Sequence, residues 1–228
     1  MEIDFWQERW DNDQIGFHQD QINPYLAYFY GEKGLPAEKR QALKVFVPLC
    51  GKSKDMLWLA RNGYPVFGVE CSERAVDAFY HENAVNFRKA ANEDGSLYQS
   101  VPDEATSLIE IYQGNFFSLQ PQHLSDVTDV FDRASLIALP GDMRREYVGK
   151  MAELLKPGTR VLLVTLSYDQ SKMNGPPFSV SEDNVNELYQ EHFNIDKLMF
   201  RNIIDDEDRF RQRGLSSLVE TVYKLVRR

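Results

Sequence analysis

The chain has 228 residues, of which 43% are hydrophobic, and its 26 Lys and Arg against 35 Asp and Glu give a formal net charge of −9. This balance argues against a nucleic-acid partner, because binding phosphates requires clustered positive charge. The sequence shows neither a basic, apolar leader nor an apolar run that would span a bilayer, so we expect no membrane partner. Its two cysteines, Cys50 and Cys71, are expected to be reduced structural thiols in a cytoplasmic protein.

Short apolar runs alternate with helical patterns from residue 45 onward, which is typical of a parallel sheet covered by helices. The expected strands lie at 45–49, 65–70, 108–112, 127–131, 160–167, 194–200 and 216–226. The expected helices lie at 55–61, from a cap at Ser72 to about 91, from the turn at 140–142 through 155, and at 181–193. Polar surface loops are expected at 92–107 and 205–214.

These elements predict an α/β fold with a doubly wound seven-stranded sheet that is mostly parallel. Because no helix separates the last two strands, we expect them to form an antiparallel C-terminal hairpin at the sheet edge. Residues 1–40 are expected to form an N-terminal helical extension that caps the ligand site, and residues 41–228 the α/β core. We find no linker, so the prediction is a single domain over residues 1–228.

In open α/β sheets ligands bind beyond the carboxyl ends of the strands. The first strand ends in Cys-Gly-Lys-Ser, but a nucleotide-triphosphate loop needs a glycine five residues before Gly51, and that position is Phe46. None of the thirteen glycines form Gly-x-Gly, so the dinucleotide fingerprint is also absent. What remains is Gly51 followed by Glu70 (70 − 51 = 19 residues), a spacing suited to binding both hydroxyls of a ribose. A solvated strand end is the alternative for Glu70.

Two more strand ends carry candidate residues. Asn115 and Phe116 follow the third strand, where they could contact the edge and face of a purine. A tight turn with a core aromatic is the alternative. Arg133 follows the fourth strand, where it could project into the cleft or form an ion pair with Asp132 or Glu70.

Aromatic residues cluster near the N-terminus at Trp6, Trp10 and Phe17, beside His18. A Trp pair four residues apart usually packs in a core. The rings could instead face a sulfonium cation, which aromatic faces attract by about 0.5–2 kcal/mol. The four histidines lack the spacing of metal ligands, so we expect no metal.

Taken together, these segments resemble the thiopurine S-methyltransferases, a branch of the S-adenosylmethionine-dependent methyltransferases with a seven-strand α/β fold. The resemblance extends along nearly the whole chain. It rests on the order and spacing of 6–10 with 17–19, 46–52, 68–70, 132–133, 167–169 and 175–178. The family shares the Pro-Leu-Cys-Gly turn in place of a glycine-rich loop.

The resemblance implies S-adenosyl-L-methionine as the cofactor and a small-molecule thiol or metalloid compound as the substrate. The implied cofactor contacts are Trp10, Leu49, Glu70, Asn115, Phe116 and Arg133. Trp6 and Phe17 would close over cofactor and acceptor. Arg209 resembles a family arginine near the acceptor, although the surrounding sequence has diverged.

Methyl transfer from a sulfonium is an in-line displacement with a neutral leaving group, so positioning the reactants is the main task of the enzyme. We expect Arg133 and Arg209 to favour the anionic form of a heteroaromatic thiol, since nearby positive charge lowers an acidic pKa. Other readings stay open: an acceptor that is a selenium or tellurium oxyanion, a halide or another small thiol, or a cofactor-binding module without catalysis. No feature of the sequence calls for a partner chain, so a monomer is expected.

Overall fold

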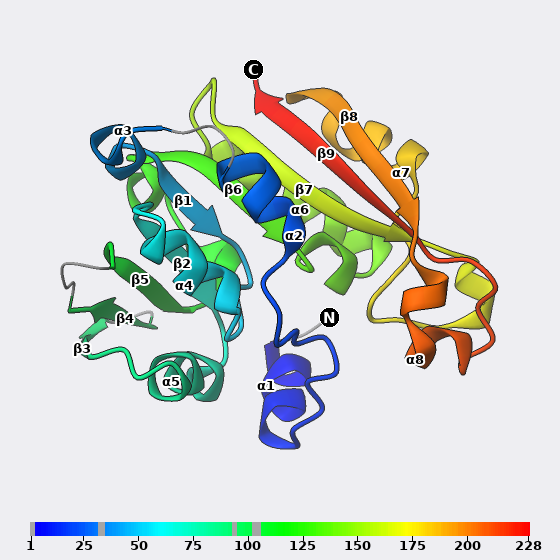
Figure 1. The fold of residues 1–228 in the computed structure, drawn as a ribbon, viewed down its shortest axis with the longest axis horizontal. Coiled ribbons are helices and arrows are strands. Elements are labelled where there is room, and N and C mark those ends of the chain that lie inside the picture. Colours follow the sequence, from blue (N-terminus) through cyan, green and yellow to red (C-terminus); the bar gives the residue numbers. More distant parts are fainter. Residues whose placement is uncertain (1–2, 32–34, 93–94, 102–105) are drawn as a thin grey trace. The chain divides into compact units, whose positions relative to one another are not determined.

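The computed structural model describes residues 3–31, 35–92, 95–101 and 106–228 (Figure 1). The chain forms two compact units, residues 2–129 and 130–228. Each unit is described by itself. The single domain over residues 1–228 and the cap formed by residues 1–40 stay predictions.

The first unit combines an N-terminal helical segment with a five-stranded sheet. Its helices are α1 (Ile3–Asp11), α2 (Pro24–Leu26) with a π-helical turn (Ala27–Gly31), α3 (Ala37–Gln41), α4 (Lys54–Arg61) and α5 (Glu73–Glu82). Its strands are β1 (Lys44–Val47), β2 (Val66–Glu70), β3 (Phe87–Asn92), β4 (Gly95–Ser100) and β5 (Ile109–Gly114). The strand order is β3-β4-β5-β2-β1.

Strand β2 is the centre of this unit. It pairs in parallel with β1 on one side and β5 on the other, and all five of its residues are buried. Helices α4 and α5 pack against it with apolar side chains such as Leu59 and Phe79, both 0% exposed. Burying a side chain of this size contributes about 1.5–3 kcal/mol. The predicted cap at Ser72 is confirmed, because its hydroxyl accepts a hydrogen bond from the Ala75 N–H.

The predicted helix from Ser72 to about 91 is wrong beyond Glu82. Ala84 adopts φ 53, and the chain then forms strand β3. The rings of Phe87 and Tyr98 pack against Tyr80 of α5, with ring centroids 4.7 and 6.1 Å from it. Tertiary packing of these rings therefore outweighs the helical spacing of the apolar residues.

The predicted polar loop at 92–107 is also wrong where it contains strand β4, which pairs antiparallel with β3 and β5. Its buried face consists of Ser96, Tyr98 and Ser100, so the alternation of apolar and polar residues that marks a strand is missing. Residues 93–94 and 102–105 of that loop lie outside the described residues. The described chain thus has nine strands, β1 to β9, where seven were expected.

The second unit begins within strand β6 (Val127–Arg133) and continues through α6 (Gly141–Leu154), β7 (Arg160–Ser167), α7 (Glu182–Tyr189), β8 (Phe193–Asn202), α8 (Asp208–Arg211) and β9 (Val219–Arg227). The predicted C-terminal hairpin is confirmed, because β8 and β9 pair antiparallel. Strand β9 also pairs antiparallel with β7, so it lies between β7 and β8 as Figure 1 shows. Helix α7 ends at Tyr189, earlier than the predicted 193.

The segment between β8 and β9 is more ordered than the polar loop predicted at 205–214. It contains a 3-10 turn (Ile204–Asp206) and helix α8. Phe210 of α8 is 3% exposed and belongs to a small apolar cluster with Met173, Ile204, Leu215 and Leu218. One buried aromatic residue in an otherwise charged segment therefore anchors it.

Candidate functional site

The turn after β1 holds an unusual backbone. Leu49 and Gly51 both lie in the left-handed region, with φ 44 and φ 51. For a residue other than glycine this conformation costs about 1–3 kcal/mol, and it persists mainly at ligand clamps and active sites. A Cβ at position 51 would lie 3.1 Å from Cζ2 of Trp10. The Pro-Leu-Cys-Gly turn therefore requires glycine both for its φ angle and for the close approach of the Trp10 ring.

Glu70 ends strand β2 beside this turn. Its side chain is 5% exposed, so the alternative of a solvated strand end is wrong. Oε2 accepts a hydrogen bond from the Gly51 N–H at 2.9 Å, and Oε1 accepts one from the Ser72 N–H at 2.8 Å. Burial raises the pKa of Glu70, and these N–H donors act against that rise. The sequence spacing thus identified a carboxylate that the fold buries and aims at the turn.

Two thiols lie next to this carboxylate. The Cys71 Sγ donates to Glu70 Oε1 at 3.3 Å, and Cys50 follows the left-handed Leu49. Burial and the Glu70 charge raise the pKa of both thiols. Both cysteines are free, as predicted.

Gly68 in the middle of β2 shows how closely the turn packs on the strand. A Cβ at this position would lie 2.8 Å from the Cys50 Sγ and 3.1 Å from the Met56 Sδ. Any larger residue would push the turn away from Glu70. In the Gly-Val-Glu sequence, Gly68 thus lets the turn after β1 pack closely on β2, and Glu70 supplies the buried carboxylate beside that turn.

The N-terminal aromatic residues form one cluster. Phe17 packs edge-on against both Trp6 and Trp10, with ring centroids 5.6 and 5.5 Å apart. Trp10 is 4% exposed, which fits the core reading, whereas Trp6 and Phe17 are half-buried. The two half-buried rings are the ones with surface left for a ligand, so their roles toward cofactor and acceptor stay predictions.

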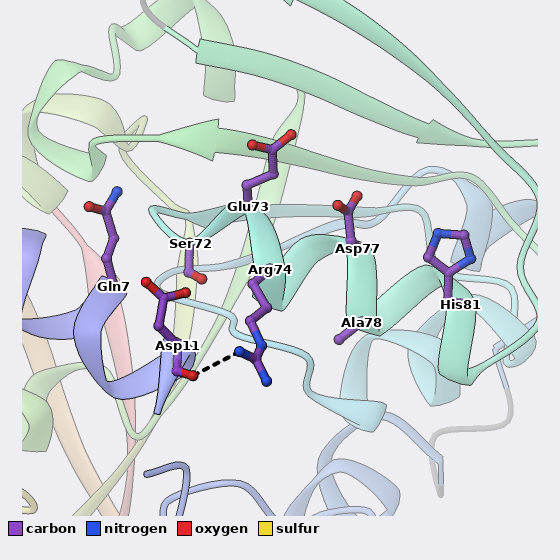
Figure 2. Close-up of a pocket in the computed structure, with 8 residues that line it drawn as sticks. All are labelled: Gln7, Asp11, Ser72, Glu73, Arg74, Asp77, Ala78 and His81. Atoms are coloured by element: carbon purple, nitrogen blue, oxygen red, sulfur yellow. Dashed lines mark hydrogen bonds between the residues drawn. The ribbon is translucent and has the colours of Figure 1, made fainter. Parts of the chain in front are cut away.

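Polar contacts with α4 and α5 hold this N-terminal segment on its unit. The Asn23 N–H donates to Asp55 Oδ1 at 2.8 Å in a buried setting. Nearer to α1, the Arg74 guanidinium of α5 donates to the Asp11 carbonyl at 2.8 Å (Figure 2). It also donates to Asp13 Oδ1 at 2.8 Å. Sequence reasoning missed these contacts, because no local pattern pairs residues so far apart in the chain.

A cavity of about 630 Å³ opens between α1 and α5 (Figure 2). Its lining residues are Gln7, Asp11, Ser72, Glu73, Arg74, Asp77, Ala78 and His81. The lining has three carboxylates and no Phe, Tyr or Trp, unlike the apolar walls typical of small-molecule sites. Ser72 lines this cavity and also donates its N–H to Glu70. Because the cavity lining is mainly polar and charged, the turn beside Glu70 is the better candidate for a ligand site.

The predicted purine contacts lie in the turn after β5. The Asn115 Oδ1 accepts a hydrogen bond from the Phe117 N–H and caps a 3-10 turn, and Phe116 is 3% exposed. These contacts match the alternative prediction for Asn115 and Phe116, a tight turn with a core aromatic residue. A cofactor role for either residue stays a prediction.

The two predicted arginines belong to the second unit. Arg133 is half-buried at the end of β6, where Ala134 follows with φ 78. Arg209 of α8 lies 3.1 Å from the carboxylate of Glu207, and its guanidinium stacks over the Phe210 ring. Arg209 keeps 46% of its side chain exposed, and its role near the acceptor stays a prediction.

Asp132, next to Arg133, is 0% exposed. Its Oδ2 accepts the Tyr147 hydroxyl at 2.7 Å, and its Oδ1 accepts the Leu136 N–H at 3.4 Å. Burial raises the pKa of Asp132, and the Tyr147 hydrogen bond opposes the rise. The sequence suggested Asp132 only as an ion-pair partner for Arg133. The apolar pattern of α6 does not indicate that Tyr147 donates a hydrogen bond to Asp132.

No helix in the described ranges is long and apolar enough to cross a membrane. Within the same ranges, no group of three or more His, Cys, Asp or Glu side chains could hold a metal ion.

Comparison of the sequence with known families gives one full-length match. The sequence model of the thiopurine S-methyltransferase family matches residues 1–228. A thiopurine S-methyltransferase of Pseudomonas fluorescens SBW25 is 42% identical over 228 residues, which are 100% of both chains. One from Nitrosospira multiformis is 41% identical over 228 residues, covering 100% of this chain and 99% of the relative.

Two solved structures with a similar fold are described as methyltransferases. An S-adenosylmethionine-dependent methyltransferase of Anabaena variabilis matches 99% of this chain and 95% of its own, with TM-score 0.64 and 12% identity. The magnesium protoporphyrin IX methyltransferase of Synechocystis, solved with S-adenosylhomocysteine, matches 100% of both chains with TM-score 0.62 and 13% identity. They confirm the predicted α/β class, with parallel central strands and antiparallel edge strands. Given the full-length family match, the chain belongs to the thiopurine S-methyltransferase family and is an S-adenosylmethionine-dependent methyltransferase.

Proposed function

We propose that this enzyme methylates the sulfur of aromatic and heterocyclic thiols, with thiopurines among its acceptors. The observation that carries the proposal is the full-length identity of about 40% to relatives that are named for this activity. The turn and carboxylate around Glu70 supply the chemistry that the cofactor requires.

The residues around Glu70 fit an adenosyl group. A ribose offers two hydroxyl donors, and Glu70 is a buried carboxylate that can accept them when ionised. The Gly51 and Ser72 N–H groups stabilise the ionised form. Leu49 beside this turn and Trp10 above it would enclose the ligand, and Asn115 and Phe116 would contact the purine.

When bound, the cofactor supplies a methyl group on a positively charged sulfur. The chain's own residues would orient the acceptor in line with that methyl group, which can contribute about 7–11 kcal/mol in favourable geometry. Trp6 and Phe17 would cover the cofactor and the acceptor and exclude water from them. Arg133 and Arg209 would favour the thiolate form of the acceptor, so a strong general base is not required.

The first experiment is incubation with labelled S-adenosylmethionine and a panel of acceptors. We expect label transfer to 6-mercaptopurine and thiophenols. Transfer only to selenite, tellurite or a halide would replace the proposed acceptor class, and cofactor binding without any transfer would indicate a non-catalytic module. We infer that the enzyme acts as a monomer in the cytoplasm; its two free thiols support a reducing compartment.

Two variants test the site residues. Glu70→Ala should lose most of its affinity for S-adenosylmethionine in calorimetry, and wild-type affinity would refute the ribose assignment. Arg209→Met should shift the pH profile of methylation to higher pH, because the thiolate loses a stabilising charge. Arg211→Met is the matched control, since Arg211 lies on the same helix and pairs with Asp208. An unchanged profile for Arg209→Met would refute its role.

A further inference from the structure

The turn after β6 has an unfavourable backbone conformation. Ala134 follows Arg133 with φ 78, in the left-handed region that a residue other than glycine adopts at a cost of about 1–3 kcal/mol. Such a conformation persists only where surrounding contacts fix it. The contacts that fix this turn therefore also set the direction in which the Arg133 side chain leaves the backbone.

The Asp132 carboxylate supplies contacts of this kind. It accepts hydrogen bonds from the Leu136 N–H at 3.4 Å and from the Ser135 N–H, and the Ser135 hydroxyl also bonds to it. The carboxylate thus joins the residue before Arg133 to the two residues after Ala134. Asp132 and Leu136 are 0% exposed and Ser135 is 1% exposed, so water does not compete for these bonds.

Tyr147 of α6 orients this carboxylate. Its hydroxyl donates to Asp132 Oδ2 at 2.7 Å and lies within hydrogen-bond reach of the Ser135 hydroxyl. Because Tyr147 bonds to Oδ2 and Leu136 bonds to Oδ1, the two donors together fix the rotation of the carboxylate. A buried carboxylate that loses a donor must turn towards another donor or take up a proton, and either change alters its bonds to the turn.

We propose that Tyr147 is a positioning residue for methyl transfer: through Asp132 it fixes the turn that directs Arg133 towards the acceptor thiol. A displacement of about 1 Å at a reacting group can cost about 100-fold in rate, so the support of the turn matters to the reaction. This inference rests on the proposed function, because it takes Arg133 as a group that favours the thiolate.

The test compares two thiols of different acidity at mildly acidic pH and saturating S-adenosylmethionine. The nitro group of para-nitrothiophenol withdraws electrons, so this thiol is already ionised, whereas para-methoxythiophenol is mostly protonated and gains more from a nearby guanidinium. Tyr147→Phe keeps the ring and removes the donor. Ser135→Ala is a milder change in the same hydrogen-bonded group. Tyr189→Phe is the control, because that buried hydroxyl has no hydrogen-bond partner within the part of the chain that the structure describes.

We expect Tyr147→Phe to lower kcat for para-methoxythiophenol about three- to tenfold, which corresponds to a rise of about 0.5–1 in the pKa of the bound thiol. It should change kcat for para-nitrothiophenol by less than about twofold, because that thiol stays ionised. Ser135→Ala should show a smaller selective loss, and Tyr189→Phe none. Arg133→Met should show the selective loss by itself, and adding Tyr147→Phe to it should increase that loss no further.

Each other outcome identifies what is wrong. An equal loss for both thiols in Tyr147→Phe, or a selective loss that Tyr147→Phe adds to Arg133→Met, would overturn the proposal, because Tyr147 would then act through stability or another group. If Tyr147→Phe does not fold by circular dichroism, Ser135→Ala carries the same comparison. A selective loss in Arg133→Met alone refutes only this inference. Wild type that methylates neither thiol refutes the proposed function and this inference with it.

Discussion

The buried pair of Tyr147 and Asp132 allows a quantitative stability prediction. Tyr147 and Asp132 are both 0% exposed, and the tyrosine hydroxyl donates to the carboxylate at 2.7 Å. Tyr147→Phe removes this donor and leaves the ring in place. Because a hydrogen bond to an ionised carboxylate contributes about 1.5–3 kcal/mol, we expect the free energy of unfolding to fall by about that amount at pH values above the raised pKa of Asp132.

Tyr189 provides the matched control. It is 1% exposed, and its hydroxyl has no hydrogen-bond partner among the described residues. The Asp132 charge raises the pKa of Tyr189 as burial does, so this tyrosine senses the same carboxylate. We expect Tyr189→Phe to change the free energy of unfolding by less than about 0.5 kcal/mol or to stabilise the fold, since it removes a buried group that makes no bond.

The effect of Tyr147→Phe should depend on pH. Burial raises the pKa of Asp132, and the Tyr147 bond holds it down, so the variant raises that pKa further. In the folded variant Asp132 then keeps its proton up to a higher pH than it does in the unfolded chain. The loss of stability is therefore complete above the raised pKa of Asp132 and shrinks as the pH falls through it.

Urea unfolding followed by far-UV circular dichroism measures these differences. All three tryptophans, Trp6, Trp10 and Trp58, lie in residues 2–129, so their fluorescence reports the other unit and serves as a test of two-state unfolding. A loss no larger for Tyr147→Phe than for Tyr189→Phe would refute the reasoning. So would a loss that grows as the pH falls.

Three further predictions concern other parts of the chain. Gly68→Ala should lose about 1–3 kcal/mol of stability because its Cβ would lie 2.8 Å from the Cys50 Sγ; adding Cys50→Ala should recover part of the loss in urea unfolding, and no recovery would exclude this clash as the cause. Arg74→Gln should speed proteolysis of the N-terminal segment that Arg74 holds, whereas Arg61→Gln should not; equal rates would contradict the assigned contact. Wild-type stability should fall as the pH rises from the ordinary pKa of Asp132, 3.8, to its raised value, and Asp132→Asn should lack this part of the fall; identical pH profiles of unfolding would contradict it.

Much of the fold was predictable because its central strands are nearly continuous apolar runs. Strand β2 and strand β7 have this pattern, and the cap at Ser72 has a local signature. Strand β4 was missed because two of its three buried residues are Ser96 and Ser100. A period of two cannot be detected when the buried face is polar.

The site was predictable only where its residues are related by strand ends. Gly51 and Glu70 were singled out because they lie at the ends of neighbouring parallel strands, and a hydrogen bond joins them, whereas the ribose role of Glu70 stays a prediction. The hydrogen bond from the Cys71 thiol to Glu70 could not be predicted, because it depends on the side-chain rotamer of Cys71. The left-handed φ of Leu49 has no signal in its residue type, because leucine rarely adopts it.

The contact between Trp10 and Gly51 has a consequence for how this protein can change. A side chain at position 51 would occupy space that the Trp10 ring fills, and a smaller residue at position 10 would open that space. The two positions therefore form one unit of variation, although 51 − 10 = 41 residues separate them. A designer who wants a larger residue at position 51 must therefore change Trp10 as well, and must also accommodate the left-handed φ of that position.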